Sequence, residues 1–303
     1  MKMVPEFLLD YNSSCMASVF ACIFLTCSYV ASLYVWRSPK NRDHPSTIKK
    51  RFFSVFCMML LAPFITRNFL SEESSSKGTF FEHMGLRMSG LITATFAPLF
   101  LTSVLFLGPL CMQYFSGLLK LYAEPMYWLH NWQDLVWIRN HIMAPLSEEW
   151  VFRACIMPLL MECLQPFMAI FTGPLLFGIA HFHHMLEQMK SGYDVRSALF
   201  VSFFKISAFQ FSYTSIFGAY SSYLFLRTGH FVAPLLAHIF CNHMGFPNFS
   251  GVLCFPPIER AIIIFSFVLG LVLWCVLLVP ITNPDLYDNK IYRDVNFQIN
   301  LFT

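Results

Sequence analysis

Long apolar runs, each of about the length of a membrane-spanning helix, alternate with short polar links along most of the chain. Crossing the hydrocarbon core of a bilayer takes roughly 20 helical residues. The runs do not show the alternating ten-residue pattern of barrel strands, so they predict helices. We expect an all-α, polytopic integral membrane protein in which residues 1–303 form a single transmembrane domain. About eight helices are predicted to cross the membrane, at residues 15–36, 52–70, 89–110, 142–164, 166–184, 199–226, 230–246 and 259–281.

Composition agrees with a membrane protein and gives no sign of a nucleic-acid partner. Hydrophobic residues make up 56% of the chain and charged residues 12%, with a mean hydropathy of +0.56, which excludes an ordinary soluble domain. The net charge of +3 is mild, so we expect no nucleic-acid partner. The ten cysteines form no CxxC pair, and we interpret them as small packing residues. Residues 111–141, which carry Trp128, Trp132 and Trp137, are predicted to form an interfacial helix.

Charge in the first link predicts the orientation. The link between the first two predicted spans, residues 37–51, contains one acid, Asp43. Its basic residues are Arg37, Lys40, Arg42, Lys49, Lys50 and Arg51. Links rich in lysine and arginine remain in the cytosol, so the amino terminus is expected on the opposite face. The first span follows a polar segment and has no basic leader or small-residue cleavage site, which favours a retained helix over a removed signal peptide.

Ionisable side chains inside apolar spans are energetically costly and therefore indicate candidate functional sites. The first candidate is SEEWVFR, at residues 147–153. Glu149 and Arg153 are four residues apart and face each other on a helix, which predicts a supporting ion pair. Glu148 points about a quarter-turn away and has no such partner, so it is available for chemistry. The alternative interpretation is a helix cap with a salt bridge at the surface.

Two further candidates follow along the chain. In FGIAHFHH, Phe177 and His181 share a helix face, and His183 and His184 follow directly. In HIFCNH, residues 238–243, His238 and Asn242 share a face and are both able to donate hydrogen bonds to one point. The alternatives are an interfacial histidine at the second site and a polar pair between helices at the third.

The predicted topology brings these sites together. Glu148 and His181 both fall at the cytosolic ends of their spans, and His238 lies midway along a short span that a cavity from the cytosol could reach. A desolvated carboxylate beside an imidazole can take a proton from water, and a second imidazole with an amide can stabilise an oxyanion. The catalytic segment, 142–246, therefore predicts hydrolysis of a carbonyl compound, with a peptide as the favoured substrate.

Other hydrolytic mechanisms are less well supported. The sequence contains neither the His-Glu-x-x-His pattern of zinc proteases nor the Gly-x-Ser-x-Gly pattern of serine hydrolases. Glu148, His181 and His238 are nevertheless residue types that bind zinc, so a zinc-dependent membrane protease stays open. Cys155 and Cys241 could lie near the site, but neither has an evident activating base.

The ordered set of motifs resembles the type II CAAX prenyl endopeptidases, the intramembrane glutamate proteases of the Ras-converting type. The resemblance rests on Glu148-Glu149-x-x-x-Arg153, Phe177-x-x-x-His181 and His238-x-x-x-Asn242, in this order and in separate predicted helices. It implies an enzyme of the endoplasmic-reticulum membrane, with its active site facing the cytosol, that removes the last three residues of prenylated CAAX proteins.

The resemblance also implies roles for individual residues. Glu148 and His181 would activate the water, His238 and Asn242 would stabilise the oxyanion, and supporting roles would fall to Glu149, Arg153 and Phe177. It implies no metal or other cofactor. The implied partners are membrane lipid and farnesylated or geranylgeranylated CAAX proteins such as small GTPases.

Two non-enzymatic functions compete with this interpretation. A membrane scaffold or binding protein could use the same fold without catalysis, and a small-solute transporter would also place polar residues near mid-membrane. The intact set of candidate catalytic residues argues against the scaffold, and the absence of matching interrupted spans in two halves argues against the transporter. The sequence does not rank the roles of His183, His184 and His243.

Overall fold

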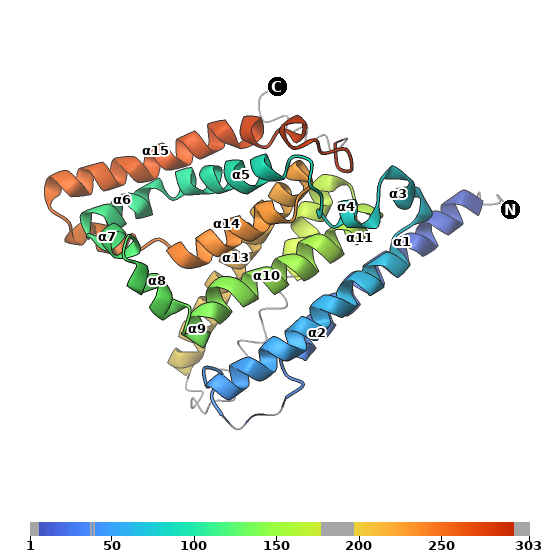
Figure 1. Cartoon of the computed structure of the whole chain (residues 1–303), viewed down its shortest axis with the longest axis horizontal. Helices are drawn as coiled ribbons and strands as arrows, with labels where there is room; N and C mark the ends of the chain where they lie inside the picture. The colour runs from blue at the N-terminus through green and yellow to red at the C-terminus, as the bar shows by residue number, and fades with distance from the viewer. Residues whose placement is uncertain (1–5, 37, 39, 177–196, 294–303) are drawn as a thin grey trace.

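A computed structural model describes residues 6–36, 38, 40–176 and 197–293, and this part of the chain is all-helical (Figure 1). Three helices are long and apolar enough to cross a membrane: α1 (Glu6–Ser32), α2 (Pro45–Phe69) and α15 (Pro257–Ile281). A fourth candidate is the pair α5 (Leu91–Leu105) and α6 (Leu107–Phe115), which is bent by 71°. A multi-pass membrane protein is thus supported, with three or four candidate spans in the described residues, and the expected count of eight stays a prediction.

The remaining predicted spans are also helical where they are described. Residues 166–184 include the short helix Pro166–Leu176, the span 199–226 corresponds to the 32-residue α13 (Ser197–Thr228), and the span 230–246 corresponds to the short α14 (Val232–Met244). The predicted span 142–164 is a succession of four segments: η1 (Arg139–Met143), α10 (Ala144–Glu149), η2 (Trp150–Ile156) and α11 (Met157–Met161).

The irregularity of this segment comes from π-helical turns in η1 and η2. Pro145 and Pro158 lie in the first turns of α10 and α11, and each lacks the backbone N–H that a continuous α-helix would use there. Wider π turns occur frequently at functional sites, because they redirect side chains relative to a regular helix. The sequence pattern gave no sign of them, since the apolar period of the segment is nearly that of an α-helix.

The expected interfacial helix at 111–141 is instead a series of short helices, which corrects that prediction. After α6 come α7 (Leu118–Tyr122), α8 (Pro125–Asn131) and α9 (Leu135–Ile138). Gly117 has a positive φ of 74°, which ends α6 in a left-handed turn, and Pro125 starts α8 afresh. Other short helices in the links are α3 (Glu72–Lys77), α4 (Phe80–His83), η3 (Ser250–Cys254) and η4 (Pro284–Tyr287).

The segment with the first motif lies in the centre of the bundle. Figure 1 shows α10 between α2 on one side and α14 on the other, and α10 contacts both helices. The following η2 packs against α1, α2 and α13, and residues 151–156 are all buried. Trp150 Nε1 donates a hydrogen bond of 2.9 Å to the Met59 carbonyl and so fixes η2 to α2. The two glutamates of the motif are therefore held on a rigid, enclosed support.

A disulfide corrects the interpretation of the cysteines as packing residues only. Cys15, in α1, is bonded to Cys163, two residues beyond the end of α11, and their Cα atoms are 5.0 Å apart. The two positions are separated by 148 residues. Pairing over such a distance depends on the packing of α1 against α11 and has no local sequence signal.

Candidate active site

A cavity of about 490 Å³ brings together residues from the first and third motifs. Its lining includes Glu148 from α10 and both His238 and Asn242 from α14. Tyr29 of α1 and Phe217 of α13 complete the surroundings of these side chains. The volume lies in the range of pockets that hold small ligands and peptides. Of the three sites predicted to converge, the first and the third thus meet at one cavity, through Glu148, His238 and Asn242.

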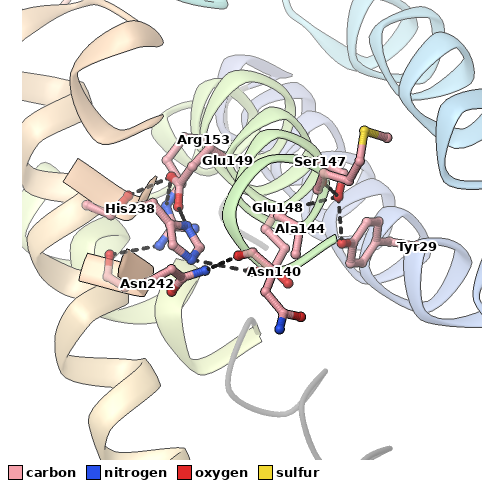
Figure 2. A network of polar contacts seen from close by, with 12 residues as sticks. Tyr29, Asn140, Ala144, Ser147, Glu148, Glu149, Arg153, His238 and Asn242 are labelled. Atoms are coloured by element: carbon pink, nitrogen blue, oxygen red, sulfur yellow. Dashed lines mark hydrogen bonds and ion pairs between the residues drawn. The ribbon is translucent and has the colours of Figure 1, made fainter. Parts of the chain in front are cut away.

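Glu149 is the centre of a buried polar network behind the cavity (Figure 2). Its side chain is 0% exposed, and Arg153 Nε lies 3.2 Å from its Oε2. The predicted ion pair between residues four apart is therefore confirmed. Arg153 also donates from Nη2 to the Gly218 carbonyl at 3.1 Å. Buried charges need such pairing, because an isolated charge is strongly disfavoured in a medium of low dielectric constant.

Two further hydrogen bonds to Glu149 were not foreseen. Ser221 Oγ donates to Oε2 at 2.6 Å, and His238 Nδ1 donates to Oε1 at 2.6 Å. Glu149 thus joins α13 and α14 to the segment that carries Glu148. The sequence signal for Ser221 was a serine pair, Ser221 and Ser222, in an apolar helix, and it did not indicate which serine faces the site.

The hydrogen bond to Glu149 also fixes which nitrogen of His238 faces the cavity. Since Nδ1 donates to Glu149, Nε2 is directed to the other side, where Glu148 Oε2 lies 3.7 Å away. The Glu148 side chain is 16% exposed, whereas that of Glu149 is completely buried. The ring of Phe217 packs against His238 with centroids 4.7 Å apart. Adjacent glutamates therefore have different environments, one enclosed by partners and the other open to the cavity.

Asn242 and Tyr29 are held in place by the irregular segment. Asn242 Nδ2 donates to the Asn140 carbonyl at 2.8 Å, and Asn140 lies in the π-helical η1. Tyr29 pairs with Ser147 Oγ at 3.0 Å. Because the Ser147 hydroxyl donates to the Met143 carbonyl at 2.7 Å, the proton of the Tyr29 pair comes from the phenol. Figure 2 shows Tyr29 and Ser147 on the side of Glu148 that faces away from His238.

The second motif cannot be placed in this network. Phe177, His181, His183 and His184 lie outside the described residues. His243 packs against aromatic rings, with its ring centroid 5.0 Å from that of Tyr122 and 5.9 Å from that of Trp128. Among the described residues, no group of three histidine, cysteine, aspartate or glutamate side chains has the arrangement of a metal site. The hypothesis of a zinc-dependent protease has Glu148, His181 and His238 as ligands, and His181 is not among the described residues.

Replacing Ser221 by alanine is expected to weaken the support of Glu149. The change removes one buried hydrogen-bond donor to a carboxylate and should lower the free energy of unfolding by about 1–3 kcal/mol. The matched control is Ser222→Ala, at an adjacent position that is 1% exposed but makes no hydrogen bond to Glu149. Thermal unfolding of both variants in detergent measures the difference. Equal losses of stability for the two variants would contradict this role of Ser221.

The arrangement has the parts needed for general-base hydrolysis. Glu148 offers a carboxylate to the cavity, His238 offers Nε2, and the Asn242 amide has one N–H left beyond its bond to Asn140. A base within reach of a water and two groups directed at one point are the usual requirements for attack on a carbonyl. The buried ion pair of Glu149 and Arg153 holds these groups without facing the cavity itself.

Comparison with known proteins agrees with the geometry. The family described as Type II CAAX prenyl endopeptidase Rce1-like matches residues 130–244. CAAX prenyl protease 2 of Homo sapiens is 44% identical over 282 residues, which cover 91% of this chain and 84% of the human protein. The protein of the same name from Rattus norvegicus is 40% identical over 91% of this chain and 83% of its own length. The one from Arabidopsis thaliana is 31% identical over 90% of this chain and 92% of its own length.

Among solved structures, none matches the chain significantly. The matched segment 130–244 nevertheless contains all of the motif residues, from Glu148 to Asn242. The similarity to the curated relatives extends well beyond this segment and over nine-tenths of the chain. This chain therefore belongs to the type II CAAX prenyl endopeptidase family.

Proposed function

We propose that the protein releases the carboxy-terminal tripeptide from prenylated CAAX proteins by hydrolysis inside the membrane. The observation that carries this proposal is the position of Glu148. Its carboxylate opens onto the cavity 3.7 Å from His238 Nε2, while Glu149 directly beside it is enclosed by three partners. One glutamate thus supports the site, and the other is available to act on water.

In the proposed mechanism, Glu148 and His181 take a proton from a water molecule, whose oxygen attacks the carbonyl carbon of the scissile peptide bond. Asn242 donates a hydrogen bond to the oxyanion that forms, and His238 donates one from Nε2 as an imidazolium, because its Nδ1 already donates to Glu149. Collapse of the tetrahedral intermediate breaks the C–N bond, and the proton held by the base passes to the leaving amine. Glu149 keeps the His238 ring oriented through Nδ1, in the way that a carboxylate orients a catalytic histidine.

The membrane setting suits this class of substrate. A farnesyl or geranylgeranyl chain partitions into the bilayer and carries the short carboxy-terminal tail of its protein to the membrane surface. We place the enzyme in the endoplasmic-reticulum membrane with the cavity open to the cytosol, because the basic link before α2 is expected on that face. Small GTPases and other prenylated CAAX proteins are the proposed substrates, and the eight-span topology is part of this proposal.

The test is release of a tripeptide from a farnesylated CAAX peptide by the purified protein in detergent, followed by mass spectrometry. We expect cleavage of the farnesylated peptide, little cleavage of the unprenylated peptide, and no loss of activity with a strong chelator. Activity lost to the chelator and restored by zinc would instead assign Glu148, His181 and His238 as metal ligands. A folded protein that cleaves neither peptide would favour the membrane scaffold.

A further inference from the structure

One face of α1 contacts the stretch that carries both glutamates at three points. The residues that α1 supplies are Cys15, Cys22 and Tyr29, which follow one another at intervals of seven. Seven residues are nearly two turns of an α-helix, so the three side chains lie along one face. Tyr29, the last of the row, also lines the cavity that contains Glu148.

The partners of this row run in the opposite direction along residues 147–163, which we call the glutamate stretch. The three pairs are Cys15 with Cys163, Cys22 with Ile156, and Tyr29 with Ser147. The first is the disulfide, and the second is a weak contact of 3.8 Å from a thiol to a backbone carbonyl. The third is a hydrogen bond of 3.0 Å between side chains that are 6% and 1% exposed, so it is sheltered from water.

The partners on the glutamate stretch are not evenly spaced. Cys163 and Ile156 are seven residues apart, but Ile156 and Ser147 are nine apart. Nine residues of a regular α-helix make two and a half turns, which would put Ile156 and Ser147 on opposite faces. Residues 150–156 form the π-helical η2, and a π turn, closed from i to i+5, holds about one residue more than an α turn. The π turns thus take up the surplus and return Ser147 to the face that meets α1.

The hydrogen bond of Tyr29 therefore fixes the rotation of α10 from one side. Ser147 is tied to α1, while Glu149, two residues further on, is tied to α13 and α14 through its own hydrogen bonds. Glu148 lies between these two anchored residues, and Figure 2 shows Tyr29 and His238 on opposite sides of it. Because the contact of Glu148 with His238 is 3.7 Å long, the direction of its carboxylate depends on the backbone that carries it.

We propose that Tyr29 is a positioning residue: through Ser147 it holds α10 at the rotation that directs Glu148 into the cavity. This inference rests on the proposed function, because it concerns the base of the same reaction. Without this hydrogen bond the π turns lose their anchor at the α10 end, while Glu149 keeps its own partners. A shift of the π register then moves Glu148 relative to His238 and to the water on which it acts.

The experiment measures kcat and KM of Tyr29→Phe with a farnesylated CAAX peptide, together with the apparent Tm in detergent. Misplacement of a catalytic group by about 1 Å can cost roughly 10²-fold in rate, so one lost anchor should lower kcat by about tenfold with KM little changed. The matched control is Tyr292→Phe, which removes another buried hydroxyl, one that donates to the His83 carbonyl at 2.7 Å and does not line the cavity. It should lower the Tm to a similar extent and leave kcat unchanged.

Ser147→Ala approaches the same hydrogen bond from the other side. It should lower kcat as Tyr29→Phe does, and the double variant should be no slower than Ser147→Ala alone, because both changes remove one shared interaction. If Tyr29→Phe cannot be purified in a folded form, Ser147→Ala tests the proposal by itself.

A Tyr29→Phe enzyme with unchanged kcat would overturn the inference, as would a double variant in which the two effects multiply. A rise in KM at constant kcat would show that Tyr29 contacts the substrate instead of holding α10. Failure of the proposed function is recognised separately, since the unmodified enzyme would then cleave no farnesylated peptide.

Discussion

Replacing Glu148 by glutamine is expected to slow tripeptide release by about 10²–10⁴-fold, the contribution typical of a positioned general base. Glutamine has nearly the same shape but cannot accept the proton of the attacking water. The side chain opens onto the cavity, and its contact with His238 is 3.7 Å long, so the fold should be retained. KM should change little, because the substituted group acts on the water rather than on the peptide. Steady-state cleavage of a farnesylated peptide measures the effect.

The matched control for this substitution is Glu124→Gln. Glu124 is an exposed glutamate that precedes α8 and does not line the cavity. We expect this variant to cleave at the rate of the unmodified enzyme. A Glu148→Gln variant that retained more than about a tenth of the activity would be too active for a protein whose general base had been removed, and the assignment of Glu148 would be withdrawn.

Replacing Arg153 by methionine is expected to destabilise the protein by about 3–5 kcal/mol, the largest loss of stability that we predict. Glu149 would keep its charge in a site where it is 0% exposed, with only Ser221 and His238 as partners. The unpaired carboxylate, rather than the loss of one contact, is the source of this effect. Thermal unfolding in detergent should show a large fall in the apparent Tm.

Two comparisons make this second prediction specific. Arg293 and Asp285 form an ion pair of 3.1 Å in which both side chains are more than 60% exposed, so Arg293→Met should cost only about 0–1 kcal/mol. The double variant Glu149→Gln/Arg153→Met removes both buried charges and should recover much of the stability. It should nevertheless cleave slowly, because His238 loses the carboxylate that orients its ring. Equal losses of stability for Arg153→Met and Arg293→Met would contradict the burial argument.

Local patterns predicted the parts of this site that depend on short sequence distances. The pair of Glu149 and Arg153 follows from helical spacing, and the same spacing indicated that Glu148 points elsewhere. The hydrogen bonds from Ser221 and His238 to Glu149 could not be predicted, because they join residues 72 and 89 positions apart. Such contacts depend on how α13 and α14 pack, which a single sequence does not specify.

The fold shows the same division between local and long-range information. Apolar runs correctly indicated helices, but length and hydropathy alone identify only α1, α2, α15 and the bent pair of α5 and α6 as candidate spans among the described residues. The helix α14 has 13 residues, and the catalytic segment is divided by π turns, so neither resembles an independent span. The polar side chains His238 and Asn242 of α14 form their hydrogen bonds with residues of the catalytic segment, Glu149 and Asn140, rather than within α14.

The disulfide between Cys15 and Cys163 has a consequence for biosynthesis. In the proposed orientation these residues lie at the lumenal end of the bundle, in a compartment that oxidises thiols. At translation rates of about 5–20 residues per second, the 148 residues between them take roughly 7–30 s to synthesise. Throughout that interval α1 carries an unpaired thiol. The bond can close only after the segment with both glutamates has entered the membrane, so oxidation marks a nascent chain whose first motif, Glu148 to Arg153, is already in place.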